Sequence, residues 1–332
     1  MKRFLSYLAV FILVCSLFYL SGPKPDKPVL SDKLPAIELK TGQVEQYIQN
    51  EEASLPVKPD NAGKIIWNND SIKNQTAYCL LYLHGFSASG YEGYPTHVDF
   101  ARHFHMNAFI PRLASHGLEV KDPLMDMTPD LLYNSAKENL RIAHILGKKV
   151  IIMSTSTGGT LSLKLAAEFP DLVDGLILLS PNIRINNPAA FLLDGPWGLQ
   201  IARMVFGGKY RYTNNDPSAE ECRYWNCFYR LEATVYLQQL IDATMKKEVF
   251  ERVHTPVFLG YYYKDRENQD PVVKVDAALK MFDQLGTPAE LKEKQSFNAG
   301  THVIGCKMFS KTQPEVEKSC IRFAERIMKI EK

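Results

Sequence analysis

The segment that most limits the fold of this chain is a buried strand that turns directly into a helix. The run from Val150 to Met153 is apolar and β-branched, as expected for a buried strand. The next six residues, STSTGG, lead without a loop into a helical pattern that Pro170 closes. Such a short turn is sterically crowded and needs small residues on both sides of its apex. Ser154 and Gly158 meet this need, which places Ser156 at the apex.

Short apolar runs and longer helical patterns alternate along the chain from Lys64 onward. Strands are expected at 79–83, 108–111, 150–153, 176–179 and 257–263, and helices at 131–146, 160–169 and 314–330. This alternation predicts an α/β fold with a mostly parallel central sheet and helices on both faces. The aromatic and polar stretch at about 183–255 breaks the alternation. We expect it to be an insertion above the sheet.

The N-terminus has the pattern of an export or membrane segment. Two basic residues precede an apolar run from Phe4 to Leu20, which has about the minimum length of a membrane-spanning helix. Basic residues stay in the cytoplasm, so the rest of the chain is expected outside it. We expect membrane attachment through residues 4–20. A cleaved signal, giving a secreted or periplasmic protein, and lipidation at Cys15 are the alternatives, although Leu20-Ser21-Gly22 is a poor cleavage site.

The domain organisation follows from composition. Residues 1–21 form the anchor or signal segment, residues 22–61 are a tether rich in Pro and Lys, and residues 62–332 are the folded domain. The net charge of +2 gives no indication of nucleic-acid binding. Six cysteines are present and lack metal-site spacing. Cys222 with Cys227, and Cys306 with Cys320, are candidate disulfides in an exported chain.

A second motif lies upstream of the Ser156 turn. The apolar run Leu81-Tyr82-Leu83 ends in His84-Gly85-Phe86, where Gly85 allows the backbone to come close to a bound molecule. Acyl transfer develops negative charge on a carbonyl oxygen, which two backbone N–H groups must face. The expected donors are Phe86 and Thr157. The next segment, Gly90 to Pro95, could border a pocket or serve only packing.

Four motifs in order resemble the α/β-hydrolase superfamily: His-Gly-Phe at 84–86, Ser-x-Ser-x-Gly at 154–158, Asp-Pro-Val-Val at 270–273 and Gly-Thr-His at 300–302. Within it, the chain looks most similar to the serine aminopeptidase-like branch that includes monoacylglycerol lipases and carboxylesterases. The resemblance covers about Asn74 to the C-terminus, without the insertion. It implies about eight strands, a lid inserted after the sixth strand at about 183–255, and neither metal nor organic cofactor.

The resemblance also implies the order nucleophile, acid, histidine along the chain. Ser156 is then the nucleophile. Only His254 and His302 follow it, and His254 precedes the strand that should carry the acid, so His302 is the expected base. Asp265 and Asp270 both follow that strand. Strand length favours Asp265, whereas the Asp-Pro-Val-Val pattern favours Asp270, which we prefer.

The predicted function is a serine hydrolase that cleaves carboxylic esters, from small molecules or lipids, through an acyl-enzyme intermediate. Two alternatives remain open at this point. The same residues could hydrolyse peptides next to a free amino terminus, or the chain could be an exported binding protein with the same fold and no turnover.

Overall fold

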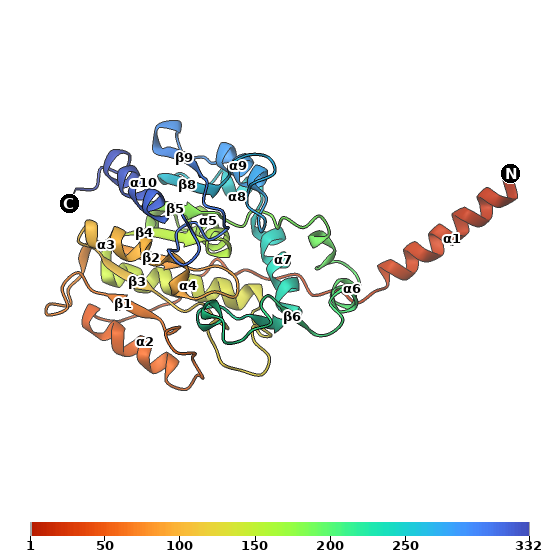
Figure 1. Ribbon diagram of the computed structural model, residues 1–332, viewed down its shortest axis with the longest axis horizontal. Coiled ribbons are helices and arrows are strands. Elements are labelled where there is room, and N and C mark those ends of the chain that lie inside the picture. Colours follow the sequence, from red (N-terminus) through yellow and green to blue (C-terminus); the bar gives the residue numbers. More distant parts are fainter. Residues whose placement is uncertain (1, 332) are drawn as a thin grey trace.

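The computed structural model describes residues 2–331, and its centre is a seven-stranded sheet (Figure 1). The strand order is β1-β3-β2-β4-β5-β8-β9, and β1 is antiparallel to β3 while all other neighbours are parallel. The strands are β1 (Lys64–Ile66), β2 (Thr76–Leu83), β3 (Asn107–Ile110), β4 (Gly147–Thr155), β5 (Gly175–Leu179), β8 (Val257–Tyr262) and β9 (Lys292–Phe297). The predicted α/β fold with a mostly parallel sheet is confirmed.

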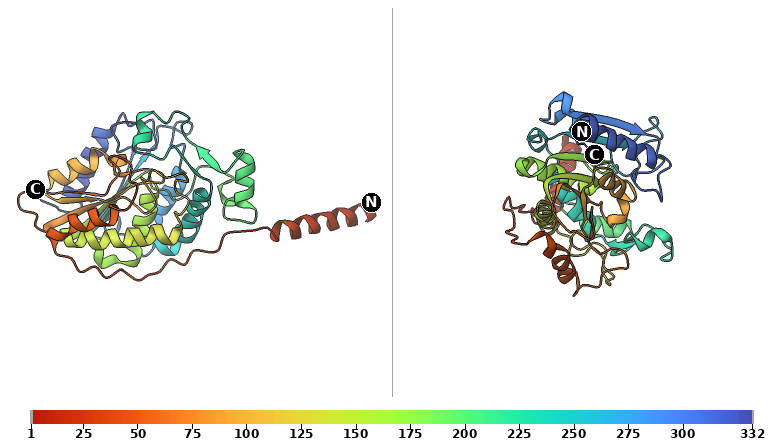
Figure 2. Two further views of the ribbon diagram at one scale, coloured as in Figure 1. Left: turned by 90° about the horizontal axis from the view of Figure 1, so that it is seen from below. Right: turned by 90° about the vertical axis from the view of Figure 1, so that its left-hand side faces the viewer.

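Helices cover both faces of this sheet (Figure 2). The helices that pack on it are α3 (Thr96–His103), α4 (Pro129–Leu146), α5 (Thr157–Glu168), α9 (Val275–Gln284) and α10 (Gln313–Arg326). Successive side chains of a strand point to opposite faces. Accordingly Val150 and Ile152 belong to the core shared with α4 and α5, while Ile151 and Met153 belong to the core shared with α3 and α10. A strand buried on both sides needs the continuous apolar run that identified it in the sequence.

The sheet differs in two respects from what the resemblance implied. It has seven strands instead of about eight, and the insertion follows β5, the fifth strand along the chain instead of the sixth. The residues before β1 form the short helices η1 (Thr41–Gln43) and α2 (Val44–Glu52) instead of a further strand. The two strands of a small separate sheet, β6 (Tyr210–Tyr212) and β7 (Phe228–Arg230), belong to the insertion.

We call residues 183–255, between β5 and β8, the cap segment. Besides β6 and β7 it contains α6 (Gly198–Val205), α7 (Glu232–Thr244) and α8 (Lys247–Phe250). A disulfide joins Cys222 to Cys227 within it, as one candidate pairing proposed. The other candidate pair is wrong, because Cys306 and Cys320 are both free and buried. Cys320 belongs to α10 and packs in the core, while Cys306 lies beside the Tyr91 carbonyl.

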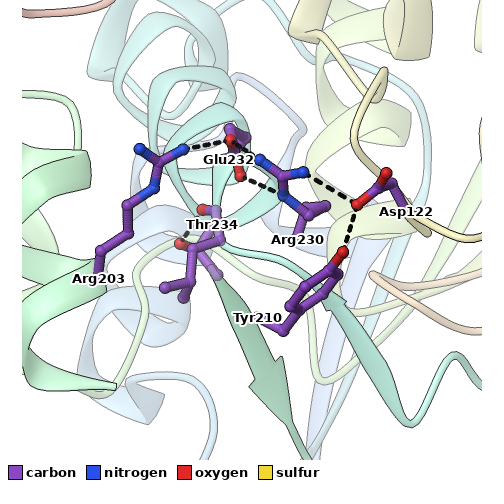
Figure 3. Close-up of polar contacts among 7 residues, drawn as sticks. Asp122, Arg203, Tyr210, Arg230, Glu232 and Thr234 are labelled. Carbon is purple, nitrogen blue, oxygen red and sulfur yellow. Dashed lines mark hydrogen bonds and ion pairs between the residues drawn. The ribbon is translucent and has the colours of Figure 1, made fainter. Parts of the chain in front are cut away.

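A charged network holds the parts of the cap segment together (Figure 3). Glu232 of α7 accepts hydrogen bonds from Arg203 of α6 at 2.6 Å and from Arg230 of β7. Arg230 also donates to Asp122 at 2.9 Å, and Asp122 accepts from Tyr210 of β6 at 2.6 Å. Ion pairs that share partners in this way are fixed more firmly than isolated surface pairs. The network therefore ties α6, β6 and β7 to α7 and to the loop before α4.

The N-terminal helix α1 (Lys2–Leu20) projects away from the domain (Figures 1 and 2). By length and composition it is a helix that could cross a membrane. The chain then runs along the domain as an extended strap, residues 21–40, without helix or strand. Buried Lys137 of α4 donates to the carbonyls of Ser31 and Lys33, both at 2.7 Å, and Gln239 of α7 donates to the carbonyl of Asp26. The strap is therefore bound to the domain along its length.

Candidate active site

The predicted site residues all follow strands of the parallel part of the sheet. Ser156 comes directly after β4, Asp270 follows β8, and His302 follows β9. The carboxyl ends of parallel strands lie at one edge of a sheet, where ligand sites of α/β proteins are found. In the sheet, β4, β5, β8 and β9 are consecutive strands. The three residues therefore lie along one edge of the sheet, within the width of four strands.

Ser156 has a strained backbone conformation at the turn between β4 and α5. Its φ of 52° and ψ of −118° lie in a region that side chains other than glycine rarely adopt. The surrounding structure enforces it: the Ser156 N–H donates to the carbonyl of Leu179 at 3.2 Å, and the Ser156 carbonyl accepts from Asn182 at 2.9 Å. The turn thus holds the Ser156 side chain at the edge of the sheet, in the geometry of a nucleophile elbow.

Gly158 allows this turn to form. A Cβ atom at position 158 would lie 1.9 Å from the carbonyl oxygen of Leu83 and 2.9 Å from that of His84. Both neighbours are backbone atoms, which cannot rotate away as a side chain would. The start of α5 and the end of β2 therefore approach each other closely because residue 158 has no side chain.

We expect the Gly158→Ala variant to be destabilised by about 3 kcal/mol, or to fail to fold, because the added methyl group overpacks a rigid backbone contact. Urea unfolding followed by tryptophan fluorescence measures the change. The control is Gly208→Ala, since a Cβ at position 208 would meet nothing within 4 Å. Equal stability of the two variants would show that the close approach at Gly158 does not constrain the turn.

His302 is paired with Asp270. Its Nδ1 lies 2.6 Å from Asp270 Oδ2, and both side chains are buried. The other oxygen of Asp270 accepts from the backbone N–H groups of Val272 and Val273 at 2.8 and 3.0 Å. Burial alone would raise the pKa of Asp270, but His302 and these N–H groups outweigh it and lower the pKa. Asp270 therefore presents a fixed negative charge to the imidazole.

The pairing acts on His302 in the opposite direction. Burial alone would lower the pKa of His302, but the charge of Asp270 and the hydrogen bond to it dominate and raise the pKa. His302 Nε2 is buried and has no hydrogen-bond partner among residues 2–331. The hydrogen bond to Asp270 on Nδ1 thus leaves Nε2 as the nitrogen that can accept a proton.

Asp265, the other candidate acid, lies apart from His302. Its carboxylate accepts hydrogen bonds from Glu267 and Asn268, and it forms a local turn with them. These contacts lower the pKa of Asp265. Asp265 lies in a hairpin-like turn after β8. The chain then returns to the end of β8, where the Asp270 N–H donates to the carbonyl of Tyr262.

The loop after β2 lies against the Ser156 turn. A Cβ on Gly85 would come within 2.9 Å of the Ser156 Cβ, so Gly85 and Ser156 are neighbours. Thr157 is the first residue of α5, and its N–H therefore has no partner within the helix. Phe86 follows Gly85 in the loop. The structure thus brings both predicted donor residues to the region of Ser156.

His84 has a structural role in this loop. Its Nε2 accepts the N–H of Leu113 at 3.1 Å, and its Nδ1 lies 2.9 Å from the carbonyl of Gly85. Burial, with a smaller contribution from His116, holds the pKa of His84 well below its usual value. A neutral imidazole can accept one hydrogen bond and donate another, which is what this position requires.

Glu92 is a residue of the site that the sequence analysis did not single out. It lies in the short helix η2 (Gly90–Gly93), is only 2% exposed, and accepts a short hydrogen bond from the Gly85 N–H. Burial raises the pKa of Glu92 to about 7, against the opposing effects of Gly85, His302 and Tyr82. The segment Gly90 to Pro95 was recognised as a possible pocket border, but no sequence signal distinguishes a buried glutamate from a solvated one.

The cap segment covers this edge of the sheet. Its Asn226 N–H donates to the carbonyl of Ser87 at 2.8 Å, and Tyr224 stacks on Tyr91 with ring centroids 3.7 Å apart. Tyr229 packs edge-on against Phe86. These contacts join the cap to the loops that flank Ser156, and Ser156 and His302 are themselves buried. Among residues 2–331, no group of three or more His, Cys, Asp or Glu side chains could hold a metal ion.

Comparisons with known proteins place the chain by its structure. No family model matches the chain, and no curated protein matches it in sequence. Among solved structures, a metagenome-derived lipolytic enzyme is similar with a TM-score of 0.61 and 16% identity, over 80% of this chain and 98% of that one. A monoacylglycerol lipase of Paleococcus ferrophilus has a TM-score of 0.57 and 11% identity, over 79% and 96%.

A third similar structure is Est1E of Butyrivibrio proteoclasticus with ferulic acid bound, at a TM-score of 0.53 and 16% identity, over 80% of this chain and 95% of that one. Sequence identities this low support a shared fold but do not identify equivalent functional residues. Together with the strand order, the strained Ser156 turn and the paired His302, they lead to one conclusion: this chain is an α/β-hydrolase by fold.

Proposed function

We propose that the protein is a serine hydrolase that cleaves carboxylic esters through an acyl-enzyme intermediate. The observation that carries this proposal is the combination of a strained apex at Ser156 with a buried His302–Asp270 pair at the same edge of the sheet. Strained backbone conformations persist only where the structure over-determines them, and they concentrate at active sites.

In the proposed reaction, His302 Nε2 takes the proton of the Ser156 hydroxyl while the serine oxygen attacks the ester carbonyl. Asp270 keeps the His302 Nδ1 protonated and stabilises the imidazolium that forms. His302 then gives its proton to the departing alcohol. Water enters, loses a proton to His302, and releases the acid from Ser156. The hydrogen bond from Ser156 to His302 Nε2 is absent here, and such bonds often tighten only with substrate.

In this proposal, the N–H groups of Phe86 and Thr157 stabilise the negative charge of the tetrahedral intermediates. The close contact of Gly85 with Ser156 supports this, because it brings the loop to the side of the nucleophile. The N-terminus of α5 adds the positive end of a helix dipole at the same point. Backbone donors that are fixed in this way before the reaction would have their full effect on the charge that develops.

The substrate is proposed to be a small-molecule or lipid ester with an apolar or aromatic acyl group. The similar structures are of a lipolytic enzyme, a monoacylglycerol lipase and a protein with ferulic acid bound. Tyr91, Tyr224 and Phe86 form the aromatic contacts between the cap and the site. Because these contacts join the cap to the loops beside Ser156, we propose that the cap segment is a lid that moves for substrate to enter.

Membrane attachment through α1 is proposed, with the domain outside the cytoplasm. Its 19 residues span about 28 Å as a helix, close to the thickness of the hydrocarbon layer. The disulfide Cys222–Cys227 fits an oxidising compartment. A cleaved signal remains the alternative, which N-terminal sequencing of the exported protein distinguishes.

The test of the proposed activity is a panel of nitrophenyl esters and aminoacyl anilides offered to the full-length protein in detergent. We expect hydrolysis of the esters and little of the anilides. Preference for anilides would favour the aminopeptidase alternative. If neither class is hydrolysed and a fluorophosphonate fails to label the folded protein, the binding protein without turnover is the correct reading.

A further inference from the structure

Several large apolar side chains of the cap segment are exposed. Met204 and Val205 at the end of α6 are 76% and 71% exposed, and Phe206 follows them. Tyr212 and Phe228 are also exposed and stack on each other, and Arg211, next to Tyr212, lies over the Phe206 ring. Exposed apolar side chains that lie together are uncommon on a water-soluble surface and mark an interaction site. We call these five apolar residues the cap apolar surface.

The segment before α6 contacts the C-terminal end of α1, which is the end nearest the domain. Trp197, directly before α6, stacks on Phe18 of α1 with ring centroids 5.3 Å apart, and its indole N–H donates to the Phe18 carbonyl. The Trp197 N–H donates to the Pro23 carbonyl at 2.9 Å. The eight residues of α6 extend about 12 Å from this contact. Figure 1 shows α6 as the helix of the domain nearest to α1.

We propose that the cap apolar surface rests on the phospholipid bilayer that α1 enters, so that the cap faces the membrane. The inference depends on the proposed attachment through α1. Phe18 lies two residues before the end of the helix, which places Trp197 at the boundary between hydrocarbon and headgroups, where tryptophan is enriched. Met204, Val205 and Phe206 lie at the far end of α6, about 12 Å along the helix from this contact, and in the proposal they touch the same lipid surface.

The charges of this region fit a lipid surface. Lys209 is exposed beside the apolar residues, and the Arg211 guanidinium lies over the Phe206 ring at 5.0 Å. Basic groups at the edge of an apolar surface favour anionic headgroups. The network of Arg203, Glu232 and Arg230 holds α6 and the β6–β7 strands in place behind this surface, as Figure 3 shows.

Spin labelling of the full-length protein in vesicles of phosphatidylethanolamine and phosphatidylglycerol tests the placement without any need for turnover. Labels are introduced as Met204→Cys and Val205→Cys in a Cys15→Ser background, with Ile72→Cys between β1 and β2 as the matched exposed apolar control. Collisions with oxygen, which concentrates in lipid, are compared with collisions with a water-soluble nickel chelate.

We expect the oxygen-to-nickel ratio at 204 and 205 to exceed that at 72 several-fold. Equal ratios at the three positions would show that the cap faces water and overturn the proposal. Failure of the protein to float with the vesicles would overturn it together with membrane attachment. Neither result depends on ester hydrolysis, so the proposed catalytic function stands or falls separately.

A second inference concerns Glu92, which the reaction described above does not use. A buried carboxylate is costly unless it is paired, yet no Lys or Arg side chain of the described residues forms an ion pair with it. A Cβ on Gly85 would be within 2.8 Å of Glu92 Oε1 and 2.9 Å of the Ser156 Cβ, so Glu92 and Ser156 flank the same glycine. Burial raises the pKa of Glu92, and the Gly85 N–H, His302 and the Tyr82 hydroxyl oppose this effect. The charge of Glu92 in turn raises the pKa of Cys306.

We infer that Glu92 is a positioning residue: it fixes the loop of Phe86 by accepting the Gly85 N–H, and from its place beside the same glycine as Ser156 it puts a carboxylate next to the proposed catalytic groups. The inference rests on the proposed function. Glu92 contributes to raising the pKa of His302, in addition to Asp270. A negative charge near the imidazole stabilises the imidazolium that forms when Ser156 is deprotonated.

Glu92→Gln separates the two effects, because the glutamine oxygen can still accept from Gly85 but carries no charge. We expect the acidic limb of the kcat/KM profile to move to lower pH by less than one unit, because Glu92, with its pKa raised to about 7, is only partly charged where His302 titrates. Glu92→Asp, which keeps the charge, should leave the acidic limb of the kcat/KM profile at its original pH. Asp99→Asn removes an exposed carboxylate of α3 and should leave the profile unchanged.

The pKa of His302 can also be read without turnover, from the NMR titration of its ring protons in Ser156→Ala protein with and without Glu92→Gln. A lower pKa in the double variant supports the inference even if the natural reaction is not ester hydrolysis. Superimposable titrations, together with an unchanged kcat/KM profile for Glu92→Gln, would show that Glu92 serves packing only.

Discussion

Replacement of Ser156 by alanine is expected to abolish fluorophosphonate labelling and to lower ester hydrolysis by roughly 10⁴-fold or more. The variant removes the only oxygen that can form the acyl-enzyme in the proposed reaction. The remaining donors at Phe86 and Thr157 would still stabilise attack by water, so a small residual rate is expected. Labelling is read by gel fluorescence, and the rate with a nitrophenyl ester in detergent.

Alanine fits the strained position no worse than serine, so the fold should survive. The matched control is Ser162→Ala, a buried serine of α5 whose hydroxyl donates to the Gly158 carbonyl at 2.7 Å. This control should keep labelling and activity within a few-fold of the original protein. Labelling that persists in Ser156→Ala would mean that another nucleophile reacts, and the assignment of Ser156 would have to be withdrawn.

Asp270→Asn is expected to lower kcat by roughly 10⁴-fold while leaving the fold intact, since the two side chains have the same shape. An amide at position 270 can donate to His302 and so favours the wrong tautomer, with the proton on Nε2. The imidazole then cannot accept the proton of Ser156. The loss of charge also lowers the pKa of His302, because Asp270 is the main group that raises it.

Asp265→Asn is the control that decides between the two acids. Its side chain is half-buried and bonded to Asn268 rather than to His302, so the variant should hydrolyse esters at nearly the original rate. A large loss in Asp265→Asn with activity retained in Asp270→Asn would reverse the assignment. Steady-state kinetics of both proteins above and below pH 7 provide the measurement.

Much of the fold could be predicted because its strongest signals are local. A strand buried on both faces must be continuously apolar, and a turn as tight as that at Ser156 admits only small neighbours. Both conditions are visible in consecutive residues. Asp270 and His302 were found by their place in a known order of motifs, and the contact between them depends on strands far apart in sequence.

The features that escaped prediction depend on long-range packing. Cys306 and Cys320 are near in sequence, yet one borders the Tyr91 loop and the other lies inside α10, so no bond joins them. Glu92 reads as an ordinary loop residue, because its burial depends on Gly85 and the cap above it. The strap of residues 21–40 reads as a flexible tether, since its bonds to Lys137 and Gln239 come from helices more than a hundred residues away.

The strap sets how far the domain can move away from α1. A free chain of twenty residues would give its domain a range of roughly 25 Å above the anchor. With the proposed attachment through α1, the bonds of residues 23–33 to Trp197, α4 and α7 would remove most of this range and keep the domain close to the anchor. For a protein attached in this way, encounter rates with a lipid ester should depend on the density of protein per membrane area more than on its concentration in volume.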